Sequence, residues 1–174
     1  NLNSERHILM SSDSEFSAET VQIKAKGLEY MNNITKAWIP IKEVISKEGD
    51  NSADDYIAYT FFIKNDGKEN VSYKTKIVIE SVIKNVDEAV RVAVYFNEKE
   101  SVYAKKAKDG SPEPQTIPFI SNHLIMQQDR NDIKPGEIDR YSIVVWLEGN
   151  DPECIDDIIG GEMKMAMVIT EKTK

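Results

Sequence analysis

The feature of this sequence that most constrains its fold is an alternation of apolar side chains with a period of two. In the stretch DYIAYTFFIK, the residues Ile57, Tyr59, Phe61 and Ile63 point to one side of an extended chain. The same period recurs in YKTKIVIESV, VRVAVYF and MKMAMVIT. A strand places such residues on one face, whereas a helix would scatter them around its axis. Each stretch therefore predicts a strand with one face in a core.

The alternation also predicts which side chains are buried, because a slip of one residue would turn every apolar side chain of a strand toward water. The stretch YSIVVWL, at 141–147, is apolar at almost every position and predicts a strand buried on both faces. We expect the following residues to be largely buried: Ile57, Tyr59, Phe61, Ile63, Ile77, Ile79, Val92, Val94, Ile143, Val145, Met165 and Met167.

Turn-forming residues separate these strands at short intervals, as in NDGKEN, KDGSPEP, KPGE and the Gly pair at 160–161. Short strands joined by such turns predict an all-β fold, namely a two-sheet antiparallel β-sandwich, jelly-roll-like, with little helix. One short helical turn fits in PECIDDIIGG. Weaker strands are expected at Val21–Ala25, Ala37–Ile39, Ser101–Ala107 and Leu124–Gln127.

The length of 174 residues predicts one domain. We expect a flexible N-terminal segment at 1–20, which is mostly polar and has no period, and a single β-sandwich domain at 21–174. The apolar residues of HILM, at 7–10, suit a strand that is added to the exposed edge of a neighbouring subunit. The alternative is a terminus that is disordered or docked on its own domain.

Charge and hydropathy limit the partners of the chain. The formal net charge is −8 and the isoelectric point is about 4.9, which argues against binding to nucleic acid or to anionic lipid. No apolar run approaches the roughly 20 residues of a membrane span. The sequence starts at Asn1 and not at Met, so we expect that a signal peptide has been removed. A single cysteine excludes an internal disulfide.

Residues for catalysis are few, and we expect no enzyme, no catalytic residue and no cofactor. The two histidines, His7 and His123, lie far apart in sequence, and no zincin, P-loop or nucleophile-elbow motif occurs. An acid–base pair of His123 with a carboxylate is the alternative. Cys154 is flanked by carboxylates, which oppose a negative charge on sulfur, so we expect an unreactive thiol.

The acidic loop after the strand at 141–147 is the best candidate for a site. Carboxylates at this density suit calcium, which prefers oxygen ligands, and the candidates are Glu148, Asp151, Glu153 and Asp156. The spacing of an EF-hand is absent, and the alternative is a solvated strand connection that binds no metal, which we expect. Stacking of sugars on Trp38, Trp146 and the tyrosines is a further possibility, although the alternation assigns most aromatic residues to the core.

The C-terminal stretch KPGEIDRYSIVVWLEGNDPECIDDIIGGEMKMAMVI, at 134–169, resembles the surface proteins of Gram-positive bacteria that carry a SipW-type signal peptide, the group that includes camelysin and the TasA-type matrix proteins. The resemblance covers about a fifth of the chain and rests on the order W-L-E-G-N-D-P-E-C followed by G-G. It implies a structural signature made of Trp146, Glu148, Gly149, Asp151, Pro152, Cys154, Gly160 and Gly161.

The resemblance implies an exported protein with a sandwich or jelly-roll fold, located at the cell surface or in the extracellular biofilm matrix. It implies a role in structure or assembly, with self-association or other surface proteins as partners. No peptidase activity follows, because the zincin motif is missing. In the signature, Glu148 and Asp151 would accept backbone N–H bonds, Pro152 would stiffen the corner, and Cys154 would pack inward. The alternative function is an extracellular module that binds glycan or calcium.

Overall fold

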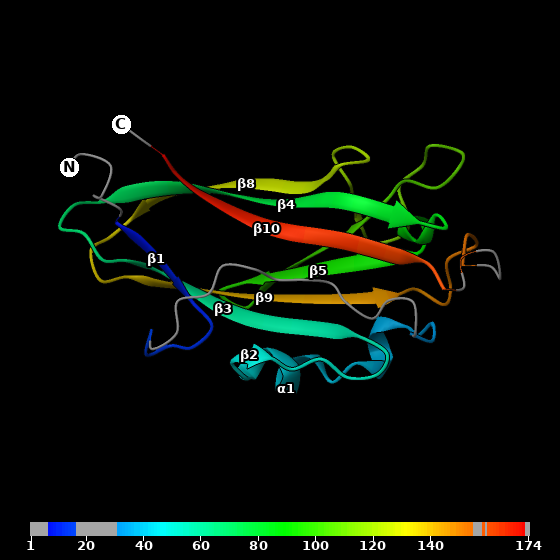
Figure 1. The fold of residues 1–174 in the computed structure, drawn as a ribbon, viewed down its shortest axis with the longest axis horizontal. Coiled ribbons are helices and arrows are strands. Elements are labelled where there is room, and N and C mark those ends of the chain that lie inside the picture. Colours follow the sequence, from blue (N-terminus) through cyan, green and yellow to red (C-terminus); the bar gives the residue numbers. More distant parts are fainter. Residues whose placement is uncertain (1–6, 17–30, 155–157, 159, 173–174) are drawn as a thin grey trace.

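The computed structural model describes residues 7–16, 31–154, 158 and 160–172, and these form two β-sheets packed face to face (Figure 1). The strands are β1 (Ile8–Ser11), β2 (Gly49–Asp50), β3 (Ile57–Asn65), β4 (Val71–Ile83), β5 (Val90–Phe96), β6 (Lys99–Ala104), β7 (Ile117–Pro118), β8 (Leu124–Ile133), β9 (Ile138–Leu147) and β10 (Glu162–Lys172). The helical segments are η3 (Lys36–Trp38), α1 (Ile41–Ser46) and η4 (Val86–Glu88).

The large sheet has the strand order β1-β3-β9-β5-β6-β7, with β2 also paired to β3, and the small sheet has the order β10-β4-β8. The pairs are antiparallel, except that β6 and β7 run parallel. The chain passes from one sheet to the other between β3 and β4, between β4 and β5, between β7 and β8, and on each side of β9. The predicted all-β sandwich is therefore confirmed.

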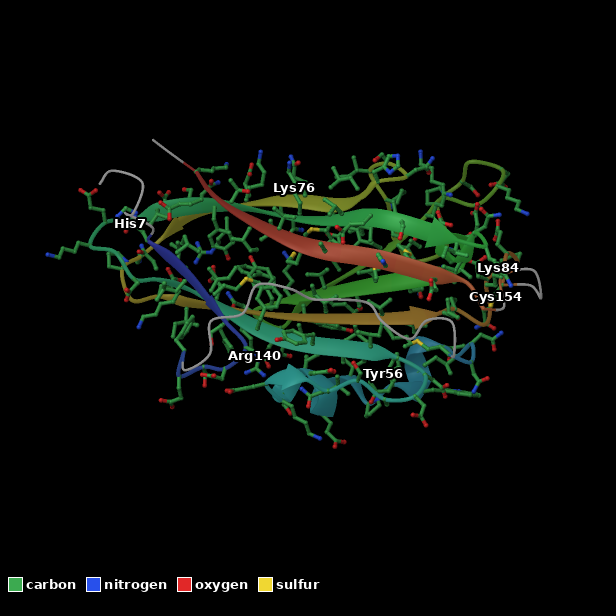
Figure 2. All side chains as sticks on the ribbon, in the orientation of Figure 1. His7, Tyr56, Lys76, Lys84, Arg140 and Cys154 are labelled. Atoms are coloured by element: carbon green, nitrogen blue, oxygen red, sulfur yellow. The ribbon has the colours of Figure 1, made fainter. Side chains whose placement is uncertain are left out.

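The main core lies between the two sheets, where the side chains of the alternating strands meet (Figure 2). All of the residues expected to be buried are buried, except Tyr59, which is half-buried. Tyr59 lies opposite Asp50 of the two-residue strand β2 and packs against the main core while remaining partly exposed. The period of two in the sequence thus identified the core faces, because successive side chains of a strand point to opposite faces of the sheet.

A second, smaller cluster covers the outer face of the large sheet. Trp146 and Tyr95 project from this face and pack against Ile34, Ile39 and Val44, which belong to the segment that contains η3 and α1. Strand β9 is consequently buried on both faces, as predicted. No described helix has the length and apolar character that are needed to span a membrane.

The weaker predicted strands have mixed outcomes. The expected strand at Ala37–Ile39 is wrong, because Lys36–Trp38 form a 3-10 turn in which Trp38 N–H bonds to Thr35 O over 3.0 Å. Three alternating residues are too few to distinguish a strand from such a turn. Strand β8 confirms the expected strand at Leu124–Gln127 and extends to Ile133. Strand β6 confirms the expected strand at Ser101–Ala107 only as far as Ala104, where it ends. The expected strand at 21–25 and the residues 155–157 and 159 of PECIDDIIGG lie outside the described residues.

Part of the N-terminal segment belongs to the sandwich. Ile8–Ser11 form β1, which pairs antiparallel with β3 in the same chain over four residue pairs, from Ile8 opposite Asn65 to Ser11 opposite Phe62. Docking on the chain's own domain, the alternative above, is therefore the arrangement of these residues in the structure. The side chains of Ile8 and Met10 pack against the main core. The sequence did not predict this packing, because residues 1–20 show no regular alternation of apolar side chains. Residues 1–6 and 17–20 lie outside the described residues.

Candidate functional site

The corner that follows β9 begins with a hydrogen-bonded turn around Glu148. Trp146 Nε1 donates to Glu148 Oε1 over 3.1 Å, and Asn150 N–H donates to Glu148 Oε2 over 3.2 Å. Backbone bonds of Ile34 to Leu147 and of Gly149 to Ile34 attach the corner to the preceding segment. Both oxygens of Glu148 therefore stabilise the turn, as the signature implied, and Glu148 is not among the carboxylates that cluster further along the loop.

The next two carboxylates of the corner turn inward. Asp151 Oδ1 accepts a hydrogen bond of 2.8 Å from Glu153 N–H, and Glu153 Oε1 accepts one of 3.1 Å from Lys108 N–H. Asp151 is 4% exposed and Glu153 is 8% exposed. The expectation of a solvated connection is therefore wrong for these residues, because the loop folds back against the segment that contains Lys108 and buries its acidic groups.

One arginine and a third glutamate complete the cluster. Arg91, on β5, places Nη1 2.8 Å from Asp151 Oδ2 and Nη2 3.8 Å from Glu113 Oε2. Glu113 comes from the loop between β6 and β7 and is 5% exposed, although both neighbouring prolines are exposed. Arg91 lies opposite Trp146 in the β5–β9 pairing, at the end of the strand where the corner begins. Three distant parts of the chain thus meet in one buried ionic cluster.

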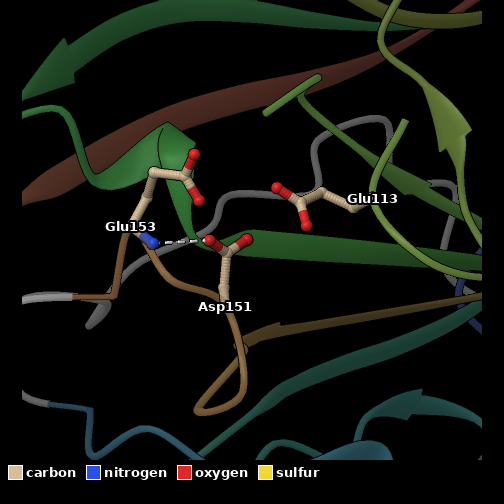
Figure 3. A group of neighbouring side chains, drawn as sticks. All are labelled: Glu113, Asp151 and Glu153. Atoms are coloured by element: carbon tan, nitrogen blue, oxygen red, sulfur yellow. Dashed lines mark hydrogen bonds between the residues drawn. The ribbon is translucent and has the colours of Figure 1, made fainter. Parts of the chain in front are cut away.

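The three carboxyl groups face a common space between the corner and the loop of Glu113 (Figure 3). One carboxylate oxygen of each residue lies within 4.8 Å of the other two. Glu113 Oε1 and Glu153 Oε2 are buried and have no hydrogen-bond partner. Burial and the nearby Asp151 raise the pKa of Glu113, although Arg91 opposes this shift. The cluster therefore has more negative charge than its own arginine compensates.

Other signature residues have structural positions along the same corner. Pro152 is exposed, and Gly160 has a φ of +78°, which suits a residue without Cβ. Gly161 is buried. Cys154 is half-buried and accepts a hydrogen bond of 3.4 Å from Asn33 Nδ2, so its expected inward packing is only partial. The last calcium candidate, at position 156, lies outside the described residues.

The sequence did not indicate Arg91 or Glu113 as site residues. Arg91 falls on the polar positions of an alternating strand, which predicts a solvated face, but this face is covered in the fold. A buried cation needs a compensating anion. The charged residue in the otherwise apolar stretch VRVAVYF could therefore have indicated that Arg91 pairs with a buried carboxylate. Glu113 lies between two prolines in the stretch KDGSPEP, whose residues predict only a turn. No feature of this stretch predicts contact with the corner after β9, which is far away in the sequence.

The histidines and the cysteine are not brought together. His7 and Cys154 lie at opposite ends of the sandwich (Figure 2). His7 Nδ1 lies 3.1 Å from Glu171 Oε2, and His123 is exposed in the bend before β8. Trp38, which is 74% exposed, is the only exposed Trp or Tyr among the described residues. The described part of the chain therefore presents no face of clustered aromatic rings for a sugar.

Comparisons with known proteins add little to this description. No protein-family model matches the chain, and no curated protein matches it. One similar solved structure is a β-glucosidase from Kluyveromyces marxianus, crystallised in complex with glucose, with 10% sequence identity and a TM-score of 0.35. The match covers 96% of this chain but only 16% of the glucosidase. This degree of similarity supports no inference about activity or ligand.

Proposed function

We propose that this chain is an exported structural protein of the bacterial cell surface or extracellular matrix, which acts by associating with protein molecules and not by catalysis. The resemblance of its C-terminal signature to SipW-dependent surface proteins supports the location. The hydrogen bonds of the corner support the same view, because Glu148 and Asp151 use carboxylate oxygens to hold backbone N–H groups. Stabilising a turn by such hydrogen bonds is a structural role, and it requires no substrate.

The observation that carries the proposed mode of action is the outer edge of the small sheet. β10 is eleven residues long and pairs with β4 on one side only, and no described strand pairs with its other side. The backbone N–H and C=O groups along such an edge can accept a strand from another molecule. An edge of this length could align several residue pairs of an incoming strand.

The strand to be donated is β1. It pairs with β3 through only four residues, and its start is held by Glu171 Oε1, which accepts N–H bonds from His7 over 3.0 Å and from Ile8 over 3.1 Å. So short a strand at the edge of a sheet can separate at modest cost and pair with a second copy of the chain instead. Head-to-tail exchange gives filaments when the rotation between successive copies does not close a ring, and an open filament is the assembly that we propose.

A disulfide that locks β1 to its own domain tests this proposal. Leu9 and Lys64 are direct partners in the β1–β3 pairing, so cysteines at both positions, with Cys154→Ala to remove the native thiol, would join the strands. We expect the oxidised protein to remain monomeric in light scattering under conditions in which the parent polymerises. Reduction of the same sample should restore polymerisation, which makes each preparation its own control.

Two results would contradict the proposal. Equal polymerisation of the oxidised and reduced proteins would mean that assembly does not need release of β1. The proposed assembly would also be refuted if the parent chain does not polymerise at any concentration and if deletion of residues 1–16 does not change its light scattering. Export is tested separately, by detecting the protein with antibodies on intact cells and in the medium of the source bacterium; a purely intracellular location would refute it.

A further inference from the structure

We propose that Glu113, Asp151 and Glu153 bind one divalent cation, and that this cation is calcium. The site joins the loop between β6 and β7 to the corner after β9, with Arg91 of β5 as the internal counter-charge. This inference is independent of the proposed assembly through β1. It also departs from the sequence-based expectation of a corner that binds no metal, because the structure adds Glu113 and buries all three carboxylates.

The number of carboxylates favours calcium over magnesium, because Mg²⁺ usually keeps several water molecules and binds only one or two carboxylates. Ca²⁺ binds oxygen ligands at about 2.3–2.6 Å, so two oxygens on the same ion lie at most about 5.2 Å apart. The corresponding limit for Mg²⁺, which binds at about 2.0–2.1 Å, is about 4.2 Å. One carboxylate oxygen of each residue lies within 4.8 Å of the other two, and this spacing is below the calcium limit. Water molecules would complete the coordination shell, as is usual where three protein carboxylates bind calcium.

Charge points the same way. Three ionised carboxylates and one guanidinium leave a net charge of −2, which one divalent cation neutralises. Burying unbalanced charge is costly, since the low dielectric of the interior strengthens the repulsion between like charges. A bound cation would remove this repulsion while each carboxylate remains ionised.

The two buried oxygens without partners are a separate indication of a ligand. Glu113 Oε1 and Glu153 Oε2 are enclosed by protein and accept no hydrogen bond, whereas nearly all buried polar atoms in folded proteins have a partner. Arg91 forms ion pairs with Glu113 Oε2 and Asp151 Oδ2. Neither Glu113 Oε1 nor Glu153 Oε2 is therefore a partner of the arginine in these ion pairs. These two oxygens belong to Glu113 and Glu153, whose carboxyl groups face a common space together with that of Asp151 (Figure 3).

Isothermal titration of the chelator-treated full chain with CaCl₂, together with thermal unfolding in the presence and absence of CaCl₂, tests the site. We expect one Ca²⁺ per chain and a rise in the unfolding midpoint, because a ligand that binds only the native state stabilises it. Glu113→Gln and Glu153→Gln, which keep the side-chain shape, should each lower the affinity by about tenfold or more, since even partners outside the first coordination shell contribute this much. Glu148→Gln is the matched control, in the same acidic corner but outside the cluster, and should retain parental affinity.

The variants are informative without calcium as well. Removing one of three crowded carboxylates relieves repulsion, so Glu113→Gln should fold and should be at least as stable as the parent in the presence of chelator. The proposal is overturned if the parent shows neither heat of binding nor a midpoint shift with CaCl₂. It is equally overturned if folded Glu113→Gln and Glu153→Gln bind Ca²⁺ as tightly as the parent, or if Glu148→Gln loses binding to the same extent as they do.

Discussion

Tyr73 of the small sheet and Asp139 of the large sheet are joined by a hydrogen bond of 2.7 Å from Tyr73 Oη to Asp139 Oδ2. Both residues are fully buried. Tyr141 Oη lies 2.7 Å from Tyr73 Oη and must donate to it, because the Tyr73 proton is used on Asp139. Arg130 Nε adds a contact of 2.9 Å to Asp139 Oδ2. A polar network therefore crosses the apolar core and fixes how the two sheets are positioned.

The substitution Tyr73→Phe should destabilise the protein by about 1–3 kcal/mol, because it leaves buried polar groups of Asp139 and Tyr141 with fewer partners. Urea unfolding followed by circular dichroism measures this loss. Tyr141→Phe is the matched comparison and should cost less, since Tyr73 then keeps its bond to Asp139. Equal losses for the two variants would contradict a network organised around Tyr73.

Alkaline pH should destabilise the protein through its buried tyrosines. Burial, followed by the neighbouring Tyr141 and Asp139, raises the pKa of Tyr73, and burial also raises the pKa of Tyr141 and of Tyr95. The unfolded chain releases these protons near the ordinary value of 10.0, before the native chain does, so stability is fully present below this pH and declines above it. Tyrosinate absorbance of the native protein should lag behind that of the unfolded protein.

The urea midpoint should accordingly fall as the pH rises beyond the ordinary tyrosine value, and it should fall less steeply in Tyr73→Phe than in the parent. Lysine titrates in the same range but is common to both proteins, so the difference isolates the tyrosine. Parallel curves for parent and variant would show that Tyr73 does not contribute.

Two signature glycines should respond differently to alanine. A Cβ on Gly161 would lie 2.7 Å from Ile83 O and 2.9 Å from Ile158 O, which are backbone atoms that cannot move aside easily. Gly161→Ala should therefore cost about 1–3 kcal/mol, as overpacking usually does. The nearest atom to a Cβ on Gly149 is 3.6 Å away, so Gly149→Ala should change stability by less than about 0.5 kcal/mol. Thermal unfolding of both variants checks the contrast, and a loss at Gly149 as large as that at Gly161 would refute it.

Cys154 should react slowly with thiol reagents in the native protein. Its sulfur is half-buried and covered by the Asn33 amide at 3.4 Å. We expect labelling at neutral pH to be slower than in urea-unfolded protein, where the thiol is accessible. Asn33→Ala should accelerate native labelling without changing the rate in urea. Native labelling as fast as that of the unfolded chain would show that the corner gives the thiol no protection.

The sequence by itself determined the strands and their core faces. Alternation in stretches such as DYIAYTFFIK and MKMAMVIT is a local property, since consecutive side chains of a strand point to opposite faces wherever that strand lies in the sheet. It also indicated the corner, because Glu148 and Asp151 bond to backbone groups two residues away and need no distant partner for this. Short segments such as Lys36–Trp38 carry too few residues for a period, and there the prediction failed.

Only the tertiary structure decided which of the acidic residues meet. Glu113 reaches Asp151 and Glu153 because the sheet order places β5 between β9 and β6. Arg91, at the start of β5, contacts the loops that follow these two neighbouring strands. The covered outer face of the large sheet likewise turned Arg91 from an expected surface residue into a buried one. No local sequence pattern predicts these contacts, because they depend on how all the strands pack together. With another strand order, the same two loops would not be in contact.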